Sequence, residues 1–398
     1  MKIGISTSVV QRGRTGIAQY LLALIREYLN APPNDEFTLF ILEEDLPLFE
    51  FARERMTLLP VSENFRPAVR NIAWHQTELP RLAKAHQLDL LHIPSYRRLL
   101  GWKPCPVVAT IHDLAPFRVR RKYDLLRMFY GRVIVRWLAH RQDQIIAVSK
   151  NTANDIERFF KIPRWEVEVI YNGLDHTRFN PFNREQAKAE MAARHQLTNP
   201  FFLYVARLEH PGKNHVRLIE AFERFKARTG SNWQLVFGGA DWHGAEYIHQ
   251  AIQRSPCKQD IKNLGFVTDE QLPQLYRAAD IFVYPSLYEG FGMPPIEAMA
   301  CGTPVISSDQ GALCEVVDNA ACIVQPTDLE SISAALTQLG MQPSLRAHFQ
   351  DAGLRRAAAF NWKRTAEETL RVYTRSAKNK APAGKLVSPS TVTQPGMS

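Results

Sequence analysis

The chain has 398 residues, of which 45% are hydrophobic and 22% charged, and its formal net charge is +9. A chain of this length and composition can bury a core in two or three domains, which excludes a wholly disordered protein. Its 20 glycines and 25 prolines are close to average usage, which also excludes collagen-like and low-complexity chains.

The cysteines and the apolar runs indicate in which cellular compartment the protein is expected. The five cysteines form no C-x-x-C pair, and an odd, scattered set is typical of free thiols in a reducing compartment. The apolar run at residues 1–5 is too short for a signal peptide, and no run of 18 apolar residues occurs. The sequence therefore predicts a cytoplasmic protein, with peripheral attachment to the inner face of the plasma membrane as an option.

Short β-rich runs alternate with helical patterns along the first half of the chain. The expected elements are strands at 2–7, 37–42, 89–93, 107–111, 144–148 and 167–171, and helices at 16–30 and 151–160. This alternation is typical of parallel strands joined by helices.

The same alternation restarts after a polar stretch around residues 175–195. The expected elements are strands at 201–206, 233–237, 261–264, 281–284, 304–307 and 322–324, and helices at 214–228, 342–358 and 362–376. The pattern predicts an α/β protein with two facing, Rossmann-like, doubly wound domains and a cleft between them. The predicted parts are an N-terminal domain (1–183), a C-terminal domain (184–360), a helix returning to the first domain (361–376) and a disordered tail (377–398).

One window, 97–141, holds 11 Lys and Arg and two Asp. Its net charge of +9 (11 minus 2) equals that of the whole chain. Within it, 123–141 predicts a helix. Its apolar side would be formed by Leu126, Tyr130, Val133, Trp137 and His140, with Arg127, Arg132 and Arg136 off that side. A basic amphipathic helix suits a membrane surface or an anionic acceptor, and a solvated face of a packed helix is equally compatible. Nucleic acid is disfavoured because no nucleic-acid-binding motif accompanies the charge.

The segment 280–302 carries the strongest chemical signal. A predicted buried strand runs into a loop that holds Glu289, and Pro294 then opens a helix. Gly290 and Gly292 allow the backbone to approach a ligand, and three N–H groups precede the helix. These belong to Phe291, Gly292 and Met293. Free donors at the positive end of a helix suit phosphate or sugar hydroxyls.

Glu289 and Glu297 lie eight residues apart, one in the loop and one in the first turns of the helix. Two carboxylates aimed into one cleft can accept paired hydrogen bonds from the vicinal hydroxyls of sugar and ribose rings. Alone, either glutamate would be an ordinary loop or helix residue. Together, with glycines and prolines between them, they predict a sugar-binding site.

The stretch from Glu289 to Met299 resembles the E-x7-E signature of retaining GT-B glycosyltransferases of family 4, in its mannosyltransferase-like form. Further matches follow in chain order over most of the sequence. They lie at 13–20, 110–114, 147–150, 171–175, 204–214 and 264–267. The pattern departs from the family at Cys314, where relatives usually have proline, and at Arg14-Thr15, which replace a small residue. The resemblance implies a GT-B fold and transfer of a sugar from a nucleotide diphosphate.

The resemblance also implies residue roles in donor binding. Arg207 and Lys213 correspond to residues that hold the diphosphate, and two fixed cations are a suitable counter-charge for that leaving group. Glu297 corresponds to the acceptor of ribose hydroxyls, and Glu289 to the residue that binds the transferred sugar together with the loop amides. His112 corresponds to a residue beside the donor sugar at the reaction centre.

Two glycine-containing loops complete the implied donor site. Gly16 corresponds to the glycine loop of the first domain that approaches the phosphate or the acceptor. The turn formed by Gly265, Phe266 and Val267 corresponds to one that contacts the base, mainly through its backbone. Without the resemblance, both would be read as ordinary turns.

The implied reaction is transfer of a hexose with retention, with the leaving phosphate taking the acceptor proton, as is favoured for the family. No D-x-D or H-E-x-x-H motif occurs, so we expect no metal site and no cofactor. The leading donor is GDP-mannose, followed by a UDP-sugar. The expected acceptor is a glycan or lipid-linked glycan in cell-surface polysaccharide or lipopolysaccharide synthesis. The alternatives are a non-catalytic glycan- or membrane-binding protein of this fold and a GT-B sugar-nucleotide epimerase.

Overall fold

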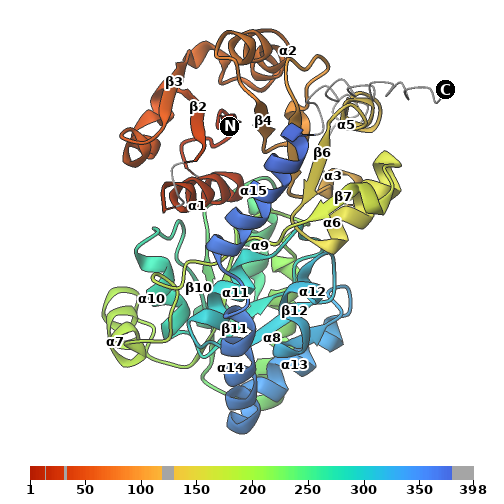
Figure 1. Ribbon diagram of the computed structural model, residues 1–398. Coiled ribbons are helices and arrows are strands. Elements are labelled where there is room, and N and C mark those ends of the chain that lie inside the picture. The colour runs from red at the N-terminus through yellow and green to blue at the C-terminus, as the bar shows by residue number, and fades with distance from the viewer. Residues whose placement is uncertain (14, 31–33, 119–129, 379–398) are drawn as a thin grey trace, which may run out of the picture.

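The computed structural model describes residues 1–13, 15–30, 34–118 and 130–378 and forms two lobes, drawn one above the other in Figure 1. Each lobe is built around one parallel sheet, so the predicted pair of doubly wound domains is confirmed. The central strands are buried on both faces, which explains their near-continuous apolar sequences.

The N-terminal lobe contains a seven-stranded sheet in the order β3-β2-β1-β4-β5-β6-β7. Its strands are β1 (Lys2–Ser6), β2 (Glu36–Leu42), β3 (Thr57–Val61), β4 (Leu90–Ile93), β5 (Val107–Ile111), β6 (Gln144–Ala147) and β7 (Val167–Val169). Its helices are α1 (Gly16–Asn30), α2 (Ala68–Ala85), α3 (Ala115–Arg118), α5 (Arg136–Ala139) and α6 (Lys150–Asp155). In this register Ile5 of β1 lies between Leu39 of β2 and His92 of β4.

The C-terminal lobe contains a six-stranded sheet in the order β10-β9-β8-β11-β12-β13. Its strands are β8 (Phe201–Val205), β9 (Gln234–Gly238), β10 (Ile261–Asn263), β11 (Ile281–Tyr284), β12 (Val305–Ser308) and β13 (Cys322–Val324). Its helices are α7 (Arg184–His195), α8 (His215–Thr229), α9 (Ala245–Arg254), α10 (Gln271–Ala278), α11 (Met293–Ala300), α12 (Leu313–Val317), α13 (Leu329–Met341) and α14 (Pro343–Ala357).

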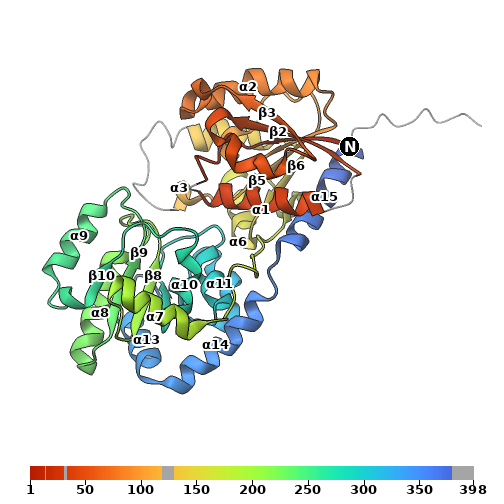
Figure 2. The same cartoon turned by 90° about the vertical axis from the view of Figure 1, so that its left-hand side faces the viewer.

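The last described helix, α15 (Trp362–Lys378), leaves the C-terminal lobe and packs on the N-terminal lobe, as Figure 2 shows. It buries Trp362 and Tyr373 in the core that α1 and β1 also line. The Tyr373 hydroxyl lies 2.7 Å from Nδ1 of His92 and accepts a hydrogen bond from the Tyr28 hydroxyl at 3.3 Å. Helix α15 therefore shares its buried face with the core of the N-terminal lobe.

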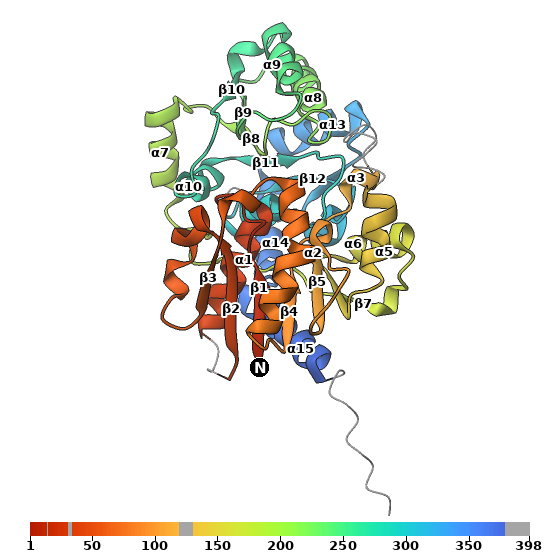
Figure 3. The same cartoon turned by 90° about the horizontal axis from the view of Figure 1, so that it is seen from above.

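Figure 3 looks down on the N-terminal lobe, where α2 lies over the sheet on the side towards the viewer. Neither β3 nor α2 was predicted from the sequence. Edge strand β3 is only partly buried and contains Pro60, and α2 carries Pro80 in its interior, so both patterns are weak. The predicted tail beyond residue 378 lies outside the described residues.

The predicted apolar side of the basic helix is wrong where it is described. Residues 119–129 lie outside the described residues, and 130–135 form a π-helical turn ahead of α5. Val133 and Trp137 are 51% and 55% exposed, whereas Val135 and Leu138 are buried. A π-turn adds one residue per turn, which rotates the buried face away from a 3.6-residue pattern.

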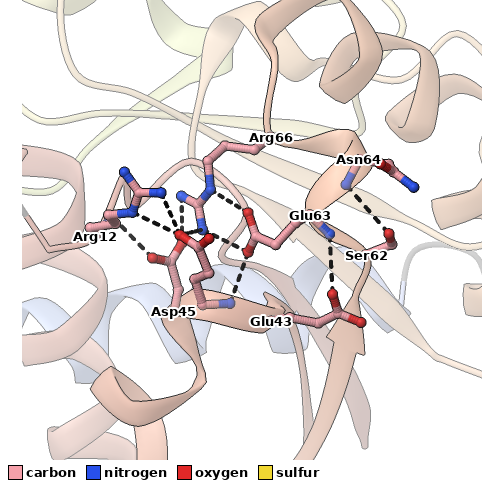
Figure 4. A network of polar contacts seen from close by, with 8 residues as sticks. Arg12, Glu43, Asp45, Ser62, Glu63, Asn64 and Arg66 are labelled. Atoms are coloured by element: carbon pink, nitrogen blue, oxygen red, sulfur yellow. Dashed lines mark hydrogen bonds and ion pairs between the residues drawn. The ribbon is translucent and has the colours of Figure 1, made fainter.

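The loop before α1 is anchored by a charged network at the ends of β2 and β3 (Figure 4). Fully buried Asp45 accepts hydrogen bonds from the backbone N–H of Arg12 at 3.0 Å and from Arg66 at 3.2 Å. Arg66 also donates to Glu63. These contacts fix the turn that contains Gly13, whose φ is +79°, so the start of α1 is held in place.

Candidate active site at the lobe interface

The strand order of the C-terminal lobe places the candidate residues at one edge. Its sheet reverses direction of winding between β8 and β11, and ligands bind at such a switch point, beyond the carboxyl ends of the strands. Arg207 and Lys213 follow β8, and Glu289 follows β11. Sequence positions more than 70 residues apart are therefore brought to one place by the topology.

Glu289 is held by three donors on a single oxygen. Its Oε1 accepts hydrogen bonds from Nζ of Lys213 at 2.5 Å, from the Ser286 hydroxyl at 2.6 Å and from the Tyr284 hydroxyl at 3.0 Å. Within the described part of the chain, Oε2 has no hydrogen-bond partner. The carboxylate is thus fixed in orientation while one oxygen stays available for ligand hydroxyls.

Lys213 shares this confined environment, since the side chains of Lys213 and Glu289 are only 17% and 16% exposed. Burial opposes the lysine charge, but nearby Glu289 and further anionic groups outweigh it and raise the pKa of Lys213. Lys213 is therefore a permanent cation at the site. Its charge is partnered by Glu289, a pairing that was not predicted from the sequence.

Arg207 lies at the open side of the same site. Its guanidinium stacks on the Trp242 ring at 4.6 Å from the centroid and lies 3.6 Å from the buried carboxylate of Glu209. Half of the Arg207 side chain is exposed. Arg207 and Lys213 share Glu209 and Tyr284 as electrostatic neighbours, so the structure brings the two cations to one place.

The loop before α11 presents unpaired backbone donors. No partner for the N–H groups of Phe291, Gly292 or Met293 is found among the described residues. Gly292 has φ of +102°, a conformation that favours glycine, and the buried Phe291 ring packs against Tyr171 and Phe360. The loop is therefore rigidly held, with its donors at the positive end of a helix.

Glu297 lies one helical turn further on, in α11. Its Oε2 accepts a hydrogen bond from the Tyr276 hydroxyl at 2.9 Å. Burial raises the pKa of Glu297 to about 7, although Tyr276 and Arg178 act in the opposite direction. The carboxyl therefore changes its protonation state near neutral pH, which the sequence did not indicate.

The turn after β10 reaches the same edge of the sheet. Gly265 has φ of +67°, and its carbonyl accepts a hydrogen bond from the N–H of Gly239 at 2.7 Å, which ties the ends of β9 and β10 together. Phe266 is 69% exposed, whereas Val267 packs towards Gly238. The exposed ring of Phe266 is open to a planar ligand.

On the facing lobe, His112 directly follows β5. Burial lowers the pKa of His112 to about 4, while a hydrogen bond to the carbonyl of Pro94 acts the other way. Its Nε2 is buried without a partner among the described residues. A neutral ring that donates to Pro94 through Nδ1 leaves Nε2 as a hydrogen-bond acceptor. This orphaned atom fits a ligand hydroxyl.

Gly16 is the first residue of α1, and among the described residues no atom beyond its chain neighbours and its own helix backbone lies within 4 Å of the position where its Cβ would be. One turn along α1, the Tyr20 ring packs edge-on against His112 at 4.8 Å between centroids. The same helix therefore connects the glycine loop to the histidine. The open space at Gly16 leaves room for a ligand.

The two lobes meet at the site itself. The carbonyl of Gly290 accepts hydrogen bonds from the hydroxyls of Ser149 at 2.7 Å and Thr152 at 3.2 Å. A Cβ at Gly290 would lie 1.9 Å from the carbonyl oxygen of His112. The loop of Glu289 and the end of β5 are therefore in direct contact.

A second contact between the lobes was missed by the sequence analysis. Glu315 of α12 accepts hydrogen bonds from the N–H groups of Lys150 and Asn151 and from the Tyr171 hydroxyl. Tyr284 and Ser286, which orient Glu289, were also missed. Polar side chains at the end of β11 were the available signal for these two, whereas nothing in the sequence points to Glu315.

The described residues contain neither a metal-binding cluster nor a membrane-spanning helix. Among the described residues, no cluster of three or more His, Cys, Asp or Glu is arranged to hold a metal ion. None of the described helices has the length and hydropathy needed to span a bilayer.

Two family models match the chain in succession. The model described as Glycosyltransferase Family 4 matches residues 14–178, and the one described as Glycosyl transferases group 1 matches residues 186–356. The two matched ranges correspond to the two lobes, and every candidate site residue lies inside one of them.

Similar proteins of known name include two mannosyltransferases. The chain is 27% identical over 391 residues to the O-antigen chain mannosyltransferase B of Escherichia coli, covering 94% of this chain and 99% of that protein. It is 30% identical over 291 residues to the MMP alpha-(1->4)-mannosyltransferase of Mycolicibacterium hassiacum, covering 67% of this chain and 65% of the other.

Among solved structures, HepE of Anabaena in complex with UDP and glucose has a TM-score of 0.75 at 19% identity. The match covers 94% of this chain and 100% of HepE. At this identity the similarity establishes the fold, which is GT-B.

Proposed function

The chain belongs to the glycosyltransferases of family 4 and group 1, and on that premise we propose that it transfers mannose from GDP-mannose with retention of configuration. The acceptor is a hydroxyl of a glycan or lipid-linked glycan in cell-surface polysaccharide or lipopolysaccharide synthesis. The names of the two mannosyltransferase relatives, one of them an O-antigen enzyme, support this choice.

The observation that carries the proposal is the environment of Glu289. Its Oε1 is saturated by Lys213, Tyr284 and Ser286, so Oε2 is directed to hydroxyls of the transferred sugar. The sugar then lies between Glu289 and the orphaned Nε2 of His112, which accepts a further sugar hydroxyl. Binding from two lobes fixes the anomeric carbon relative to the acceptor.

The departing diphosphate requires positive charge as the anomeric C–O bond breaks. Arg207, Lys213 and the amides before α11 provide it, so the reaction proceeds in our proposal without a divalent metal. The acceptor oxygen forms the new bond to the same face of the sugar and passes its proton to the leaving phosphate oxygen. No protein base is needed for that transfer.

The donor proposal is tested by thermal denaturation with GDP-mannose, UDP-glucose and ADP-glucose in the presence of a chelator. A ligand at 100 times its Kd stabilises by about 2.7 kcal/mol, and we expect this for GDP-mannose alone. NMR of the product must show the α-anomer. Stabilisation by UDP-glucose only, or a need for divalent metal, contradicts the proposal.

We also propose that the exposed face around α5 docks on an anionic membrane surface. Trp102, Val133 and Trp137 are each more than half exposed, and Arg132 and Arg136, next to Val133 and Trp137 in the chain, are exposed too. Large apolar and aromatic side chains interleaved with arginines suit the interface between headgroups and acyl chains.

Sedimentation with phosphatidylglycerol vesicles at low salt tests this face. We expect the wild type to sediment and the double variant Arg132→Glu/Trp137→Ser to stay in the supernatant. Arg81→Gln, an exposed arginine on α2, serves as the matched control. Equal sedimentation of the double variant and the wild type excludes this docking face.

A further inference from the structure

A second ligand site is indicated at the switch point of the N-terminal sheet. The order β3-β2-β1-β4 means that the sheet reverses its direction of winding between β1 and β4. Ser6 and Ser8 lie at the end of β1, and Arg98 follows β4. This edge is the same one that carries His112 and therefore faces the C-terminal lobe.

Arg98 is a cation without an anionic partner. Its Nε donates to the side-chain oxygen of Asn71 at 2.5 Å and its NH1 donates to the carbonyl of Arg97, and no carboxylate lies within ion-pair distance in the described ranges. Burial lowers the pKa of Arg98 to about 10, so the guanidinium is still charged at neutral pH. A partly buried, unneutralised cation is costly unless a ligand compensates it.

Asn71 provides the second observation. The hydrogen bond from Arg98 fixes which way its side-chain amide points, because only the oxygen can accept it. The amide nitrogen Nδ2 is then buried, in a residue that is 1% exposed, and has no partner among the described residues. An unsatisfied N–H donor thus lies on the same amide group that the guanidinium contacts.

From this juxtaposition we propose that Arg98 and Asn71 bind a phosphate group carried by the acceptor. The proposal deepens the proposed function, because it names a substrate class for the N-terminal lobe of a glycosyltransferase. Phosphate is favoured over carboxylate because its oxygens do not lie in one plane and can meet the guanidinium and the amide N–H together. The acceptor phosphate would then lie in the N-terminal lobe, on the side from which His112 projects.

The test uses the full chain with GDP at saturation, which occupies the cationic donor site at Arg207 and Lys213. Sodium phosphate is then added, with sodium chloride and sodium acetate at equal ionic strength as references, and the melting temperature is measured. We expect a phosphate-specific increase in the wild type and in the control Arg81→Gln. Asn71→Asp is expected to abolish it, because this near-isosteric change keeps the contact with Arg98 and neutralises its charge.

Arg98→Lys is expected to weaken the phosphate effect by about tenfold in concentration, since it keeps the charge but loses the fork of donors. Full phosphate stabilisation of Asn71→Asp, or an equal effect of acetate in the wild type, overturns the proposal. Sedimentation of Asn71→Asp with phosphatidylglycerol vesicles distinguishes a phosphate on a soluble acceptor from one on a lipid-linked acceptor. Wild-type sedimentation assigns the phosphate to a soluble acceptor, and reduced sedimentation assigns it to a lipid-linked one. The increase in melting temperature with GDP alone is measured separately. A failure of the donor proposal is therefore distinguishable from a failure of the phosphate proposal.

Discussion

Glu289 and Lys213 illustrate how a single pair of residues defines the site. We expect Glu289→Gln to lower kcat/KM for GDP-mannose hydrolysis at least tenfold. The variant loses a charged acceptor, and a charged hydrogen bond contributes about 1.5–3 kcal/mol. The measurement is initial-rate kinetics without acceptor. Glu330→Gln, an exposed partner of Arg228, is the control and should keep wild-type rates. Wild-type hydrolysis by Glu289→Gln contradicts the role given to Glu289.

At the same scale, Glu297 makes stability depend on pH. A carboxyl whose pKa is raised to about 7 binds a proton more readily in the folded chain than in the unfolded one. Its stabilising contribution is complete below about pH 4.5 and is lost as the pH rises through 7. We therefore expect the free energy of unfolding of the wild type, relative to Glu297→Gln, to fall by about 3 kcal/mol between pH 4 and pH 8. Denaturant titrations of both proteins at each pH measure this free energy. Parallel pH profiles of the two proteins contradict the prediction.

At the scale of elements, α15 joins the lobes through buried polar contacts. Tyr373→Phe removes the partner of His92 Nδ1 and leaves that atom unsatisfied in the core. We expect a loss of about 1–3 kcal/mol in the free energy of unfolding. Arg371→Gln, on the exposed side of the same helix, should change it by less than about 0.5 kcal/mol. If both variants unfold like the wild type, the packing of α15 is not a determinant of stability.

At the scale of the whole molecule, we expect activity to depend on the contact between the lobes at Gly290. A methyl group there would lie 1.9 Å from the His112 carbonyl oxygen and 2.6 Å from Cβ of Asp113, so Gly290→Ala must separate the lobes locally. We expect sugar transfer to fall at least a hundredfold, while GDP affinity, which depends on the C-terminal lobe, changes less than about threefold. Small-angle scattering should show a larger radius of gyration. An unchanged scattering curve together with full sugar transfer would show that the contact at Gly290 is not needed for activity.

The sequence by itself determined the local structure and the chemical candidates. Buried strands such as Val107–Ile111 and the helix start at Pro294-Pro295 follow from short-range propensity, so these elements were predicted from the sequence. The partly buried edge strand β3 and the π-turn before α5 were not, because their patterns are weak or out of phase. Glu289 was identified as a candidate from its own segment, and His112 and Arg207 from the resemblance to a known family.

Only the tertiary structure decided which groups are paired and which are free. Lys213 lies on Glu289, His112 Nε2 and Asn71 Nδ2 are left without partners, and Glu315 receives three donors from the other lobe. The contacts join residues that are far apart in the chain, and the unpartnered atoms are enclosed by such residues. Both therefore depend on burial. Burial removes the competing water, so it decides whether an isolated polar atom is costly or already satisfied.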